Sequence, residues 1–396
     1  MYRDLKTIFH MSAAEADRVY RSRSAEGTPI SLSLNAEQPF FYLMVPEVYS
    51  RLLDAERLDR KINELVATLP SDATNRYVVN CMIDEIILTN DIEGVVSTRK
   101  EIEKALDALR KNDKRVRFQG IVNKYQSLAL SEDVALDSCE DVRALYDELV
   151  LEEVLKEDPS KAPDGKLFRK DSVNVVDAAQ RIIHQNTFSE DRITEELANA
   201  LAFFNDNSIE PLVRAAVFHF TFAFIHPFYD GNGRMDRFMS SYLISREFSR
   251  YAGIRLSYSI KENIRQYYKA FATAQHPLNK GDITPFILAF LDIVIDALQK
   301  THDALLEKQQ TTEELKAKLR ARFDLDASDG LYTFGSSLID GTLFTDKGLS
   351  VEDLADDLRI SEPTIYKRLS FFEKAGVLEK RRDGKRNYYV MDVSKL

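Results

Sequence analysis

Apolar residues recur every three or four positions along most of this chain, which predicts a protein built mainly of α-helices. Strand-like alternation is confined to short stretches, of which residues 166–175 read as an extended hairpin. The predicted fold class is therefore mainly α, with a short β-hairpin and a small α+β module at the C-terminal end. The predicted helices cover residues 47–69, 77–89, 97–111, 141–155, 189–205, 211–225, 234–248, 257–273, 282–298 and 307–324.

The C-terminal module has its own pattern. Residues 327–342 contain three glycines and read as a boundary region. Two short helices follow, over 350–358 and 362–375, and then two strands joined by an Asp-Gly turn, over 377–382 and 385–390. Helix, turn, helix and two-stranded wing resemble a winged helix-turn-helix domain.

Composition and charge narrow the class of protein. The chain has 396 residues and a formal net charge of −10, so bulk electrostatics do not favour nucleic-acid binding, and only a local basic patch could serve. The two cysteines, Cys81 and Cys139, are isolated, which together with the absence of a signal sequence predicts a reducing, cytoplasmic location. The longest apolar run, residues 215–225, is too short to cross a bilayer, so no membrane partner is expected.

The residue types suited to catalysis and ligand binding lie together in one stretch, HPFYDGNGRMDR, residues 226–237. It joins two predicted helices, and its turn opens directly into the second one. Gly231, Asn232 and Gly233 can therefore present backbone N–H groups at a helix N-terminus, which is an anion site. Arg234 and Arg237 are three residues apart, hence on one helix face, and their fork-shaped donors suit phosphate.

Two further residues of the stretch complete a nucleotide-handling set. Asp230 supplies an oxygen ligand suited to Mg²⁺ or Mn²⁺ beside phosphates. His226 is the residue there whose ordinary pKa lies near neutrality, which makes it the natural general base. The alternative is a purely structural role, a helix corner whose polar residues only cap helix ends. A cap, however, needs a single Asn or Asp and not this whole set.

The stretch resembles the signature of the Fic (filamentation induced by cyclic AMP) family, His-Pro-Phe-x-Asp/Glu-Gly-Asn-Gly-Arg-x-x-Arg, at every specified position. The resemblance extends over most of the chain, to about Ala297. It implies transfer of AMP from ATP to a hydroxyl side chain of a target protein. The related Doc phosphotransferases depart from the Gly-Asn-Gly-Arg part, which this chain keeps, so adenylylation is favoured over phosphate transfer.

A second motif lies upstream of the first. Thr89-x-x-x-Glu93-Gly94 resembles the Ser/Thr-x-x-x-Glu-Gly/Asn inhibitory motif of autoinhibited Fic proteins. The resemblance implies that Glu93 reaches Arg237 and occupies the guanidinium that the γ-phosphate of ATP needs. The alternative is a surface glutamate beside a glycine that caps a helix.

The resemblance also implies further contacts. A flap beginning near Gly165-Lys-Leu-Phe-Arg169 would dock the target by main-chain pairing, with a simple structural hairpin as the alternative. Of Tyr267 and Tyr268, we expect Tyr268 to lie against the adenine. His219 is expected to be a core histidine. A homodimer is expected, and the targets include the chain itself.

The winged helix adds a DNA-binding hypothesis. Between residues 360 and 386, eight basic and four acidic residues leave a local charge of +4. A protein-docking role is the alternative. The residues expected to meet DNA are Thr364, Tyr366, Lys367, Arg368, Arg381 and Arg382.

The sequence thus predicts an autoinhibited protein adenylyltransferase that uses ATP and a divalent metal. The expected domains are a helical N-terminal region (1–115), a Fic catalytic domain (116–298), a connector (299–335) and a winged helix (336–396). Two alternatives stay open: a DNA-binding regulator whose Fic part senses nucleotide, and an enzyme that removes AMP with the help of Glu93.

Overall fold

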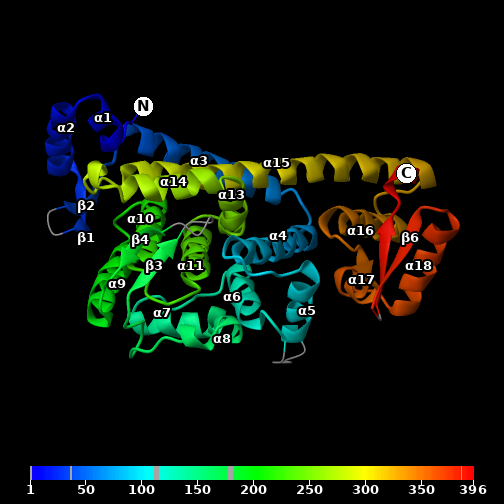
Figure 1. Ribbon diagram of the computed structural model, residues 1–396. Helices are drawn as coiled ribbons and strands as arrows, with labels where there is room; N and C mark the ends of the chain where they lie inside the picture. The colour runs from blue at the N-terminus through cyan, green and yellow to red at the C-terminus, as the bar shows by residue number, and fades with distance from the viewer. Residues whose placement is uncertain (1, 36–37, 111–115, 177–181, 385) are drawn as a thin grey trace. The chain divides into compact units, whose positions relative to one another are not determined.

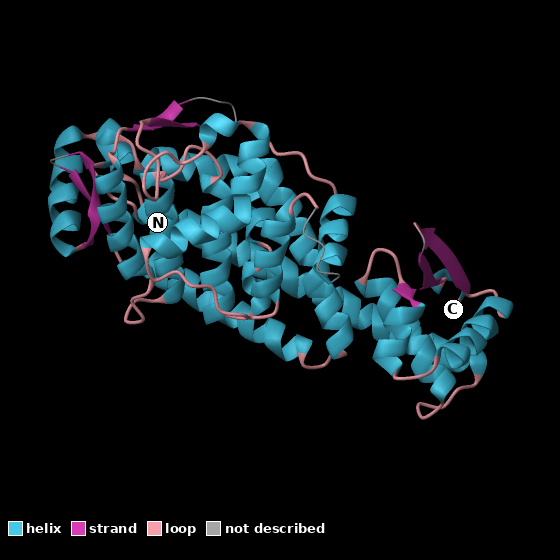
Figure 2. Cartoon of the chain, turned by 90° about the horizontal axis from the view of Figure 1, so that it is seen from below, coloured by secondary structure: helices cyan, strands magenta, loops and turns pink. Residues whose placement is uncertain are grey.

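The computed structural model describes residues 2–35, 38–110, 116–176, 182–384 and 386–396, and most of them are helical (Figure 1). Strands occur only in small groups among the helices (Figure 2), which confirms the mainly α prediction. By spatial proximity the chain divides into two units, residues 1–60 with 81–299 (unit 1) and residues 61–80 with 300–396 (unit 2). The predicted domain boundaries placed residues 61–80 in the N-terminal region, whereas here they group with the C-terminal part.

Unit 1 is helical apart from two small hairpins. Helices α3 (Pro46–Val66), α4 (Ser71–Ile92) and α15 (Thr284–Phe323) cross the division. The other elements are α1 (Leu5–Met11), α2 (Ala13–Glu26), β1 (Thr28–Asn35), β2 (Gln38–Tyr42), α5 (Arg99–Arg110), α6 (Gln119–Ala129), α7 (Cys139–Tyr146), η1 (Asp147–Leu151), α8 (Glu152–Glu157), η2 (Pro159–Lys161), β3 (Val173–Val176), β4 (Ile182–Asn186), α9 (Glu190–Phe204), α10 (Pro211–Ile225), α11 (Asn232–Glu247), α12 (Arg250–Gly253), α13 (Leu256–Glu262), α14 (Ile264–Ala274) and η3 (Pro277–Asn279).

Helices α10 and α11 form the centre of unit 1 and pack side by side (Figure 1). Almost every side chain of α10 is buried, including all four of its phenylalanines, Phe218, Phe220, Phe222 and Phe224. A helix that is apolar on all sides must be surrounded by other elements, and α9 packs on it as well. The loop between α10 and α11 carries the predicted chemistry and is therefore fixed at both ends by buried helices.

The predicted hairpin lies later in the chain than expected. Residues 166–172 form an irregular loop, and β3 begins only at Val173 and pairs with β4 in antiparallel register. Two features hold the loop away from extended pairing. Gly165 N donates to Phe168 O at 2.9 Å, and the Glu190 carboxylate accepts from the backbone N–H groups of Leu167 and Phe168.

Helix α15 is longer than predicted. The sequence suggests separate helices over 282–298 and 307–324, whereas the structure has one helix from Thr284 to Phe323. Residues 299–306 contain no Pro or Gly, and both Thr301 and Leu305 are fully buried, so nothing in this stretch breaks the helix.

Unit 2 is built around a core of apolar side chains from the C-terminal part of α15 and from the elements that follow. Residues 61–80 belong to it because Arg76 pairs with Asp357 and Asn80 donates to the Phe344 carbonyl at 2.8 Å. Its three-stranded sheet has the order β5-β7-β6. The elements are α16 (Gly330–Phe344), β5 (Leu349–Ser350), α17 (Val351–Leu358), α18 (Glu362–Lys374), β6 (Leu378–Asp383), β7 (Arg386–Met391) and η4 (Val393–Lys395).

The glycine-containing stretch 327–342 is not a linker, which corrects the prediction of a boundary region. It forms α16, and Gly335 lets this helix approach its neighbours closely. A Cβ on Gly335 would lie 2.7 Å from Leu319 Cδ2 and 2.9 Å from Phe372 Cζ. The glycine that suggested a flexible segment is thus a packing residue.

Candidate active site

His226 ends helix α10 in a left-handed backbone conformation, with φ 52° and ψ 64°. This conformation is uncommon for a residue other than glycine. Its N–H donates to Phe222 O at 2.9 Å, and its ring Nδ1 lies 3.4 Å from Ala223 O. The chain therefore turns sharply at His226 and presents the side chain at the mouth of the loop.

The loop after His226 is anchored through its own side chains. The Phe228 ring is fully buried and stacks on Tyr146, with ring centroids 3.7 Å apart. Asn232 closes the loop, because its Oδ1 accepts from Phe228 N at 3.0 Å and its Nδ2 donates to Phe228 O at 2.8 Å. Both ends of the Asn232 amide thus shape the loop, and its expected contact with phosphate stays a prediction.

Two glycines let other groups approach the start of α11. Gly231 has a positive φ of 78° and precedes the first turn of the helix. At Gly233 an added Cβ would overlap Glu93 Oε1 and lie 2.9 Å from Arg237 Nη1. The space over Gly233 is occupied by the carboxylate of Glu93, which lies at the helix N-terminus where anions bind well.

Arg237 joins α11 to α4. Its Nη2 lies 2.8 Å from Glu93 Oε1 and 3.1 Å from the Thr89 carbonyl, and its Nε donates to Thr89 Oγ1 at 2.8 Å. Arg237 is only 2 % exposed, and the Glu93 side chain is 24 % exposed. The structure therefore brings together Thr89, Glu93 and Arg237, as the two motifs predict.

The pair is charged near neutral pH. Burial acts to raise the pKa of Glu93, but the charge and hydrogen bond of Arg237 outweigh burial and leave this pKa below its ordinary value. Burial likewise acts to lower the pKa of Arg237, and the Glu93 carboxylate reverses the effect. Each partner keeps the other ionised in a site that would otherwise disfavour both charges.

Gly94 ends helix α4 in the left-handed conformation, with φ 78°. Val95 N donates to Asn90 O at 2.9 Å, and Gly94 N donates to Asp91 O at 3.1 Å, which is the Schellman pattern of helix termination. The glycine therefore caps the helix, and the glutamate before it pairs with Arg237, while the inhibitory role of this pair stays a prediction.

Arg234 is the most incompletely bonded of the buried cations in the loop region. It is 1 % exposed, and its Nε and Nη2 make no hydrogen bond within the described part of the chain. The nearest carboxylate is Asp230, whose Oδ1 lies 3.8 Å from Nη2. Buried donors of this kind require an acceptor, and a phosphate oxygen would supply one.

Asp230 carries a partly exposed carboxylate that also accepts from Gly231 N. Among the described residues, no three His, Cys, Asp or Glu side chains gather into a metal-binding cluster. A single carboxylate suits Mg²⁺, which commonly uses one or two carboxylates with substrate phosphates and water. Asp230 fits a metal that arrives with a nucleotide.

Tyr267 and Tyr268 on α14 differ in burial. The Tyr267 hydroxyl lies 2.7 Å from Nε2 of His219, and both residues are buried. His219 is thus a core histidine, and burial lowers its pKa to about 3. Tyr268 is partly exposed, and its contact with adenine stays a prediction.

The residues expected to meet DNA lie in unit 2 and are only partly available. Tyr366 is 53 % exposed, and Lys367 beside it is exposed as well. Arg368 instead lies against α16, with its guanidinium 5.8 Å from the ring centre of Phe334, and its contact with DNA stays a prediction. The Thr364 hydroxyl lies 3.0 Å from the Ser361 hydroxyl. On the wing, Arg381 and Arg382 are exposed, and Arg381 Nη2 lies 3.1 Å from Glu379 Oε2.

Two residues to which the sequence assigned no role of their own support the loop. Arg169 is fully buried and bonds to the backbone of His226, and the Tyr229 hydroxyl donates to Asp164 Oδ1 at 2.9 Å while accepting from Asp171 N at 3.0 Å. Both link residues 164–171 to the catalytic loop. Arg169 lies in the segment that resembles the start of a flap, and Tyr229 stands at an unspecified position of the motif, so neither pattern pointed to this supporting role.

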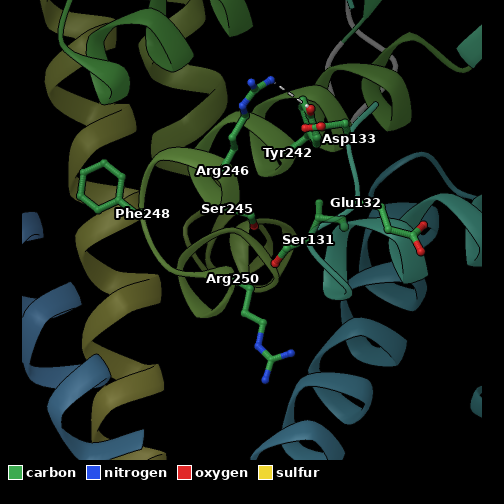
Figure 3. A pocket seen from close by; sticks show the side chains of 9 residues that line it. Ser131, Glu132, Asp133, Tyr242, Ser245, Arg246, Phe248 and Arg250 are labelled. Carbon is green, nitrogen blue, oxygen red and sulfur yellow. Dashed lines mark hydrogen bonds between the residues drawn. The ribbon is translucent and has the colours of Figure 1, made fainter. Parts of the chain in front are cut away.

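A separate cavity of about 260 Å³ lies in unit 1 (Figure 3). Two arginines, two acids and two serines line it together with Tyr242, whose hydroxyl accepts from Arg246 at 3.3 Å (Figure 3). None of its lining residues belongs to either motif.

Among the described residues, every helix is too short or too polar to cross a lipid bilayer.

Comparison with known proteins agrees with this geometry. Residues 136–244 match the family model described as Fic/DOC family. Protein adenylyltransferase fic-1 of Caenorhabditis elegans is 28 % identical over 152 residues, covering 34 % of this chain and 28 % of the relative. Protein adenylyltransferase Fic of Drosophila grimshawi is 36 % identical over 100 residues, covering 25 % of this chain and 18 % of the relative.

A solved structure shares the fold over a longer span. The crystal structure of a Fic family protein from Desulfovibrio desulfuricans G20 aligns with a TM-score of 0.52 and 20 % identity, covering 88 % of this chain and 97 % of that one. The family match places a Fic domain at residues 136–244, and the solved structure shows that the fold is shared. It spans under a third of the length of the two curated relatives that it matches.

Proposed function

We propose that this protein is an adenylyltransferase that moves AMP from ATP to a Ser, Thr or Tyr hydroxyl of a target protein, with release of pyrophosphate. The observation that carries the proposal is the pair of buried arginines at the N-terminus of α11. Arg234 has donors without acceptors, and the one carboxylate on Arg237 comes from another helix. The curated relatives of the Fic domain are named protein adenylyltransferases, which supports the same activity.

The proposed chemistry assigns each residue a role. The N–H groups at Gly231 and Gly233 would bind the phosphates, with Arg234 and Arg237 on the β- and γ-phosphates. His226 would accept the proton of the target hydroxyl as its oxygen bonds to the α-phosphorus. The bond from that phosphorus to the bridging oxygen of the β-phosphate would break, and pyrophosphate would leave. Positioned positive charge would supply most of the rate.

Asp230 would hold the divalent metal, and Tyr268 would pack against the adenine. When bound, Mg²⁺ or Mn²⁺ would neutralise part of the phosphate charge. Asn232 would contribute by fixing the loop, through its two bonds with Phe228.

The proposed regulation is autoinhibition by Glu93. Its carboxylate lies over Gly233 and against Arg237, which is the space and the cation that the γ-phosphate would require. ATP could bind beside it only with its α-phosphate turned away from the attacking hydroxyl. Arg237 is buried and the Glu93 carboxylate is only partly exposed, and because each keeps the other ionised, this inhibited state should persist near neutral pH.

The direct test of the reaction type is the fate of each phosphate. The Glu93→Gly variant is incubated with metal and ATP labelled either at the α- or at the γ-phosphate. Adenylylation predicts protein-bound label from the α-position only. Label from the γ-position only would indicate phosphate transfer and contradict the proposal.

A second candidate function is DNA binding by unit 2. It is favoured by the exposed cluster on α18 and on the wing, which includes Tyr366, Lys367 and the basic residues of β6. Binding would be salt-sensitive and would survive His226→Ala. Fluorescence anisotropy with a labelled duplex tests it, and Lys367→Glu with Arg382→Glu should abolish binding. A protein that binds no duplex at low salt would exclude this candidate.

A further inference from the structure

Arg169 is a buried cation whose hydrogen bonds go to neutral oxygens. It is 0 % exposed, and its guanidinium donates to five acceptors. Four are backbone carbonyls, those of Asp171, Phe188, Ile225 and His226, and the fifth is Asn186 Oδ1. Burial lowers the pKa of Arg169 to about 10. A buried charge with no paired carboxylate among the described residues is costly and calls for a role.

The five acceptors belong to three segments that are far apart in sequence. Asp171 O, at 2.6 Å, precedes β3 of the hairpin, while Asn186 Oδ1, at 2.9 Å, belongs to the last residue of β4. His226 O, at 2.7 Å, and Ile225 O, at 3.2 Å, end helix α10. One guanidinium therefore fastens both ends of the hairpin to the residue proposed as the general base.

The arrangement also stabilises an unusual backbone. His226 has a positive φ of 52°, and its carbonyl accepts the Nε–H of Arg169. A cation at the C-terminal end of α10 is favoured by the helix dipole, which offsets part of the cost of burial. The backbone N–H of Arg169 donates to Pro227 O at 3.1 Å, so the residue grips the turn from both its main chain and its side chain.

The loop that carries Arg169 is itself held firmly. The Glu190 carboxylate accepts from two of its N–H groups, and Arg143 Nη1 donates to Leu167 O at 2.8 Å. The Tyr229 hydroxyl fastens its ends through Asp164 and Asp171. A firmly held loop is what a positioning residue requires, because a mobile arginine could not fix its partners.

We propose that Arg169 is a positioning residue that sets the His226 ring relative to the β3–β4 hairpin, and so aligns the base with an incoming target hydroxyl. The inference rests on the proposed adenylyl transfer. Among the described residues, Arg169 makes no hydrogen bond with residues 231–237, so its loss should affect the transfer step and leave ATP affinity unchanged. Lysine cannot replace it, because one ammonium has three donors and cannot reach five acceptors on three segments.

The test is done in the Glu93→Gly background, with Arg169→Lys as the variant and Arg214→Lys as the matched control. Arg214 is also buried on α10, but it bonds to Phe204 O, Asn207 and Glu247, away from His226. Arg169→Lys should slow α-label transfer about 10- to 100-fold, as a misplacement of about 1 Å does. Its ATP dissociation constant by calorimetry should stay within about twofold, and Arg214→Lys should change neither quantity.

A readout without turnover separates positioning from general damage. With histidines labelled for NMR, the His226 ring signal, identified by its loss in His226→Ala, should move in Arg169→Lys and stay in place in Arg214→Lys. Calorimetric ATP binding reports that each variant is folded. Should Arg169→Lys not fold, Asn186→Ala removes one acceptor and should give a smaller loss of the same kind.

The outcomes are distinguishable. Transfer at the parent rate, with an unmoved His226 signal, would overturn the role of Arg169. Equal losses of α-label transfer in Arg169→Lys and Arg214→Lys would show that Arg169 contributes only to the general stability of the fold. No label in the Glu93→Gly parent would count against the proposed function instead, while the NMR comparison would still decide whether Arg169 positions His226.

Discussion

Glu93 Oε1 lies 2.8 Å from Arg237 Nη2, although the two residues are 144 positions apart in the chain. Thr89, one turn earlier on α4, bonds to the same guanidinium through both its hydroxyl and its carbonyl. Helix α4 thus satisfies Arg237 with three oxygens. An arriving phosphate would have to compete with all of them, which makes the end of α4 the regulated element of the proposed enzyme.

The Thr89 hydroxyl should strengthen the inhibitory contact. Thr89→Val leaves the buried Nε–H of Arg237 without its acceptor, which should cost about 1–3 kcal/mol in the free energy of unfolding. It should also raise basal α-label incorporation, though less than Glu93→Gly does. Thr89→Ser keeps the hydroxyl and is the matched control. Equal labelling by the valine and serine variants would show that this hydrogen bond plays no part.

Gly94 should contribute through its backbone alone. Its φ is +78° and an added Cβ would meet nothing within 4 Å, so Gly94→Ala introduces strain of about 1–2 kcal/mol without a clash. Because the strain falls at the end of α4, basal labelling should rise. Gly376 in unit 2 has a φ of +73° and the same open surroundings, so Gly376→Ala should lower stability and leave labelling unchanged. A rise in labelling with both variants would contradict a local effect.

Glu85 should make stability fall as pH rises. It is fully buried beneath the N-terminus of α13, where it accepts from Ser257 N, and burial raises its pKa to about 7. Since the folded state holds the proton more tightly than the unfolded chain, its stabilising contribution is complete below pH 4.5 and is lost up to about pH 7. The loss is on the order of 3 kcal/mol.

Other groups titrate in the same window, so the comparison must be with Glu85→Gln, which cannot ionise. The stability of this variant relative to the wild type, measured by urea unfolding, should improve between pH 5 and about pH 7 and level off by pH 8. A constant difference across that range would show that Glu85 does not titrate there.

Arg234 should serve binding at the expense of stability. Replacing it with methionine removes buried donors that have no acceptor, and should raise the free energy of unfolding by about 1–3 kcal/mol while abolishing ATP binding. Arg214→Met is the control, because Arg214 is paired with Glu247 at 3.0 Å and its loss should destabilise the fold. A destabilised Arg234→Met that still binds ATP would mean that the residue is structural.

The part of the site that could be predicted from the sequence is the part formed by residues adjacent in the chain. The loop between α10 and α11 was readable because its glycines, acid, amide and arginines adjoin one another. The Glu93–Arg237 pair was predicted from two distant motifs only through family resemblance, since spacing along the chain says nothing about which helices meet. The prediction of a Fic domain is confirmed by the family match of residues 136–244, and the mainly α fold is confirmed as well.

Other features depend on tertiary structure and could not be predicted from local patterns. Arg169 follows an apolar Leu-Phe pair, and only the fold reveals that its partners lie near 186 and 226. The glycines of α16 suggest a linker, yet Gly335 packs against Leu319 and Phe372. Helix α15 continues through a polar stretch because Thr301 and Leu305 are buried by tertiary contacts.

The alternative role of Glu93 is to promote the removal of AMP from a modified protein, and one experiment distinguishes this role from autoinhibition. If Glu93 orients a water that removes AMP, then wild-type protein added to labelled Glu93→Gly should release its label as AMP, and His226→Ala should not. Autoinhibition without the reverse reaction predicts that the label stays on the protein in both mixtures.

The central claim is that Glu93 restrains adenylyl transfer that depends on His226. The most direct measurement is α-label incorporation by wild type, Glu93→Gly and His226→Ala, each incubated with ATP and Mg²⁺. The account predicts strong labelling of Glu93→Gly, weak labelling of wild type and none of His226→Ala. Absence of label from all three proteins, although each is folded and binds ATP, would contradict it.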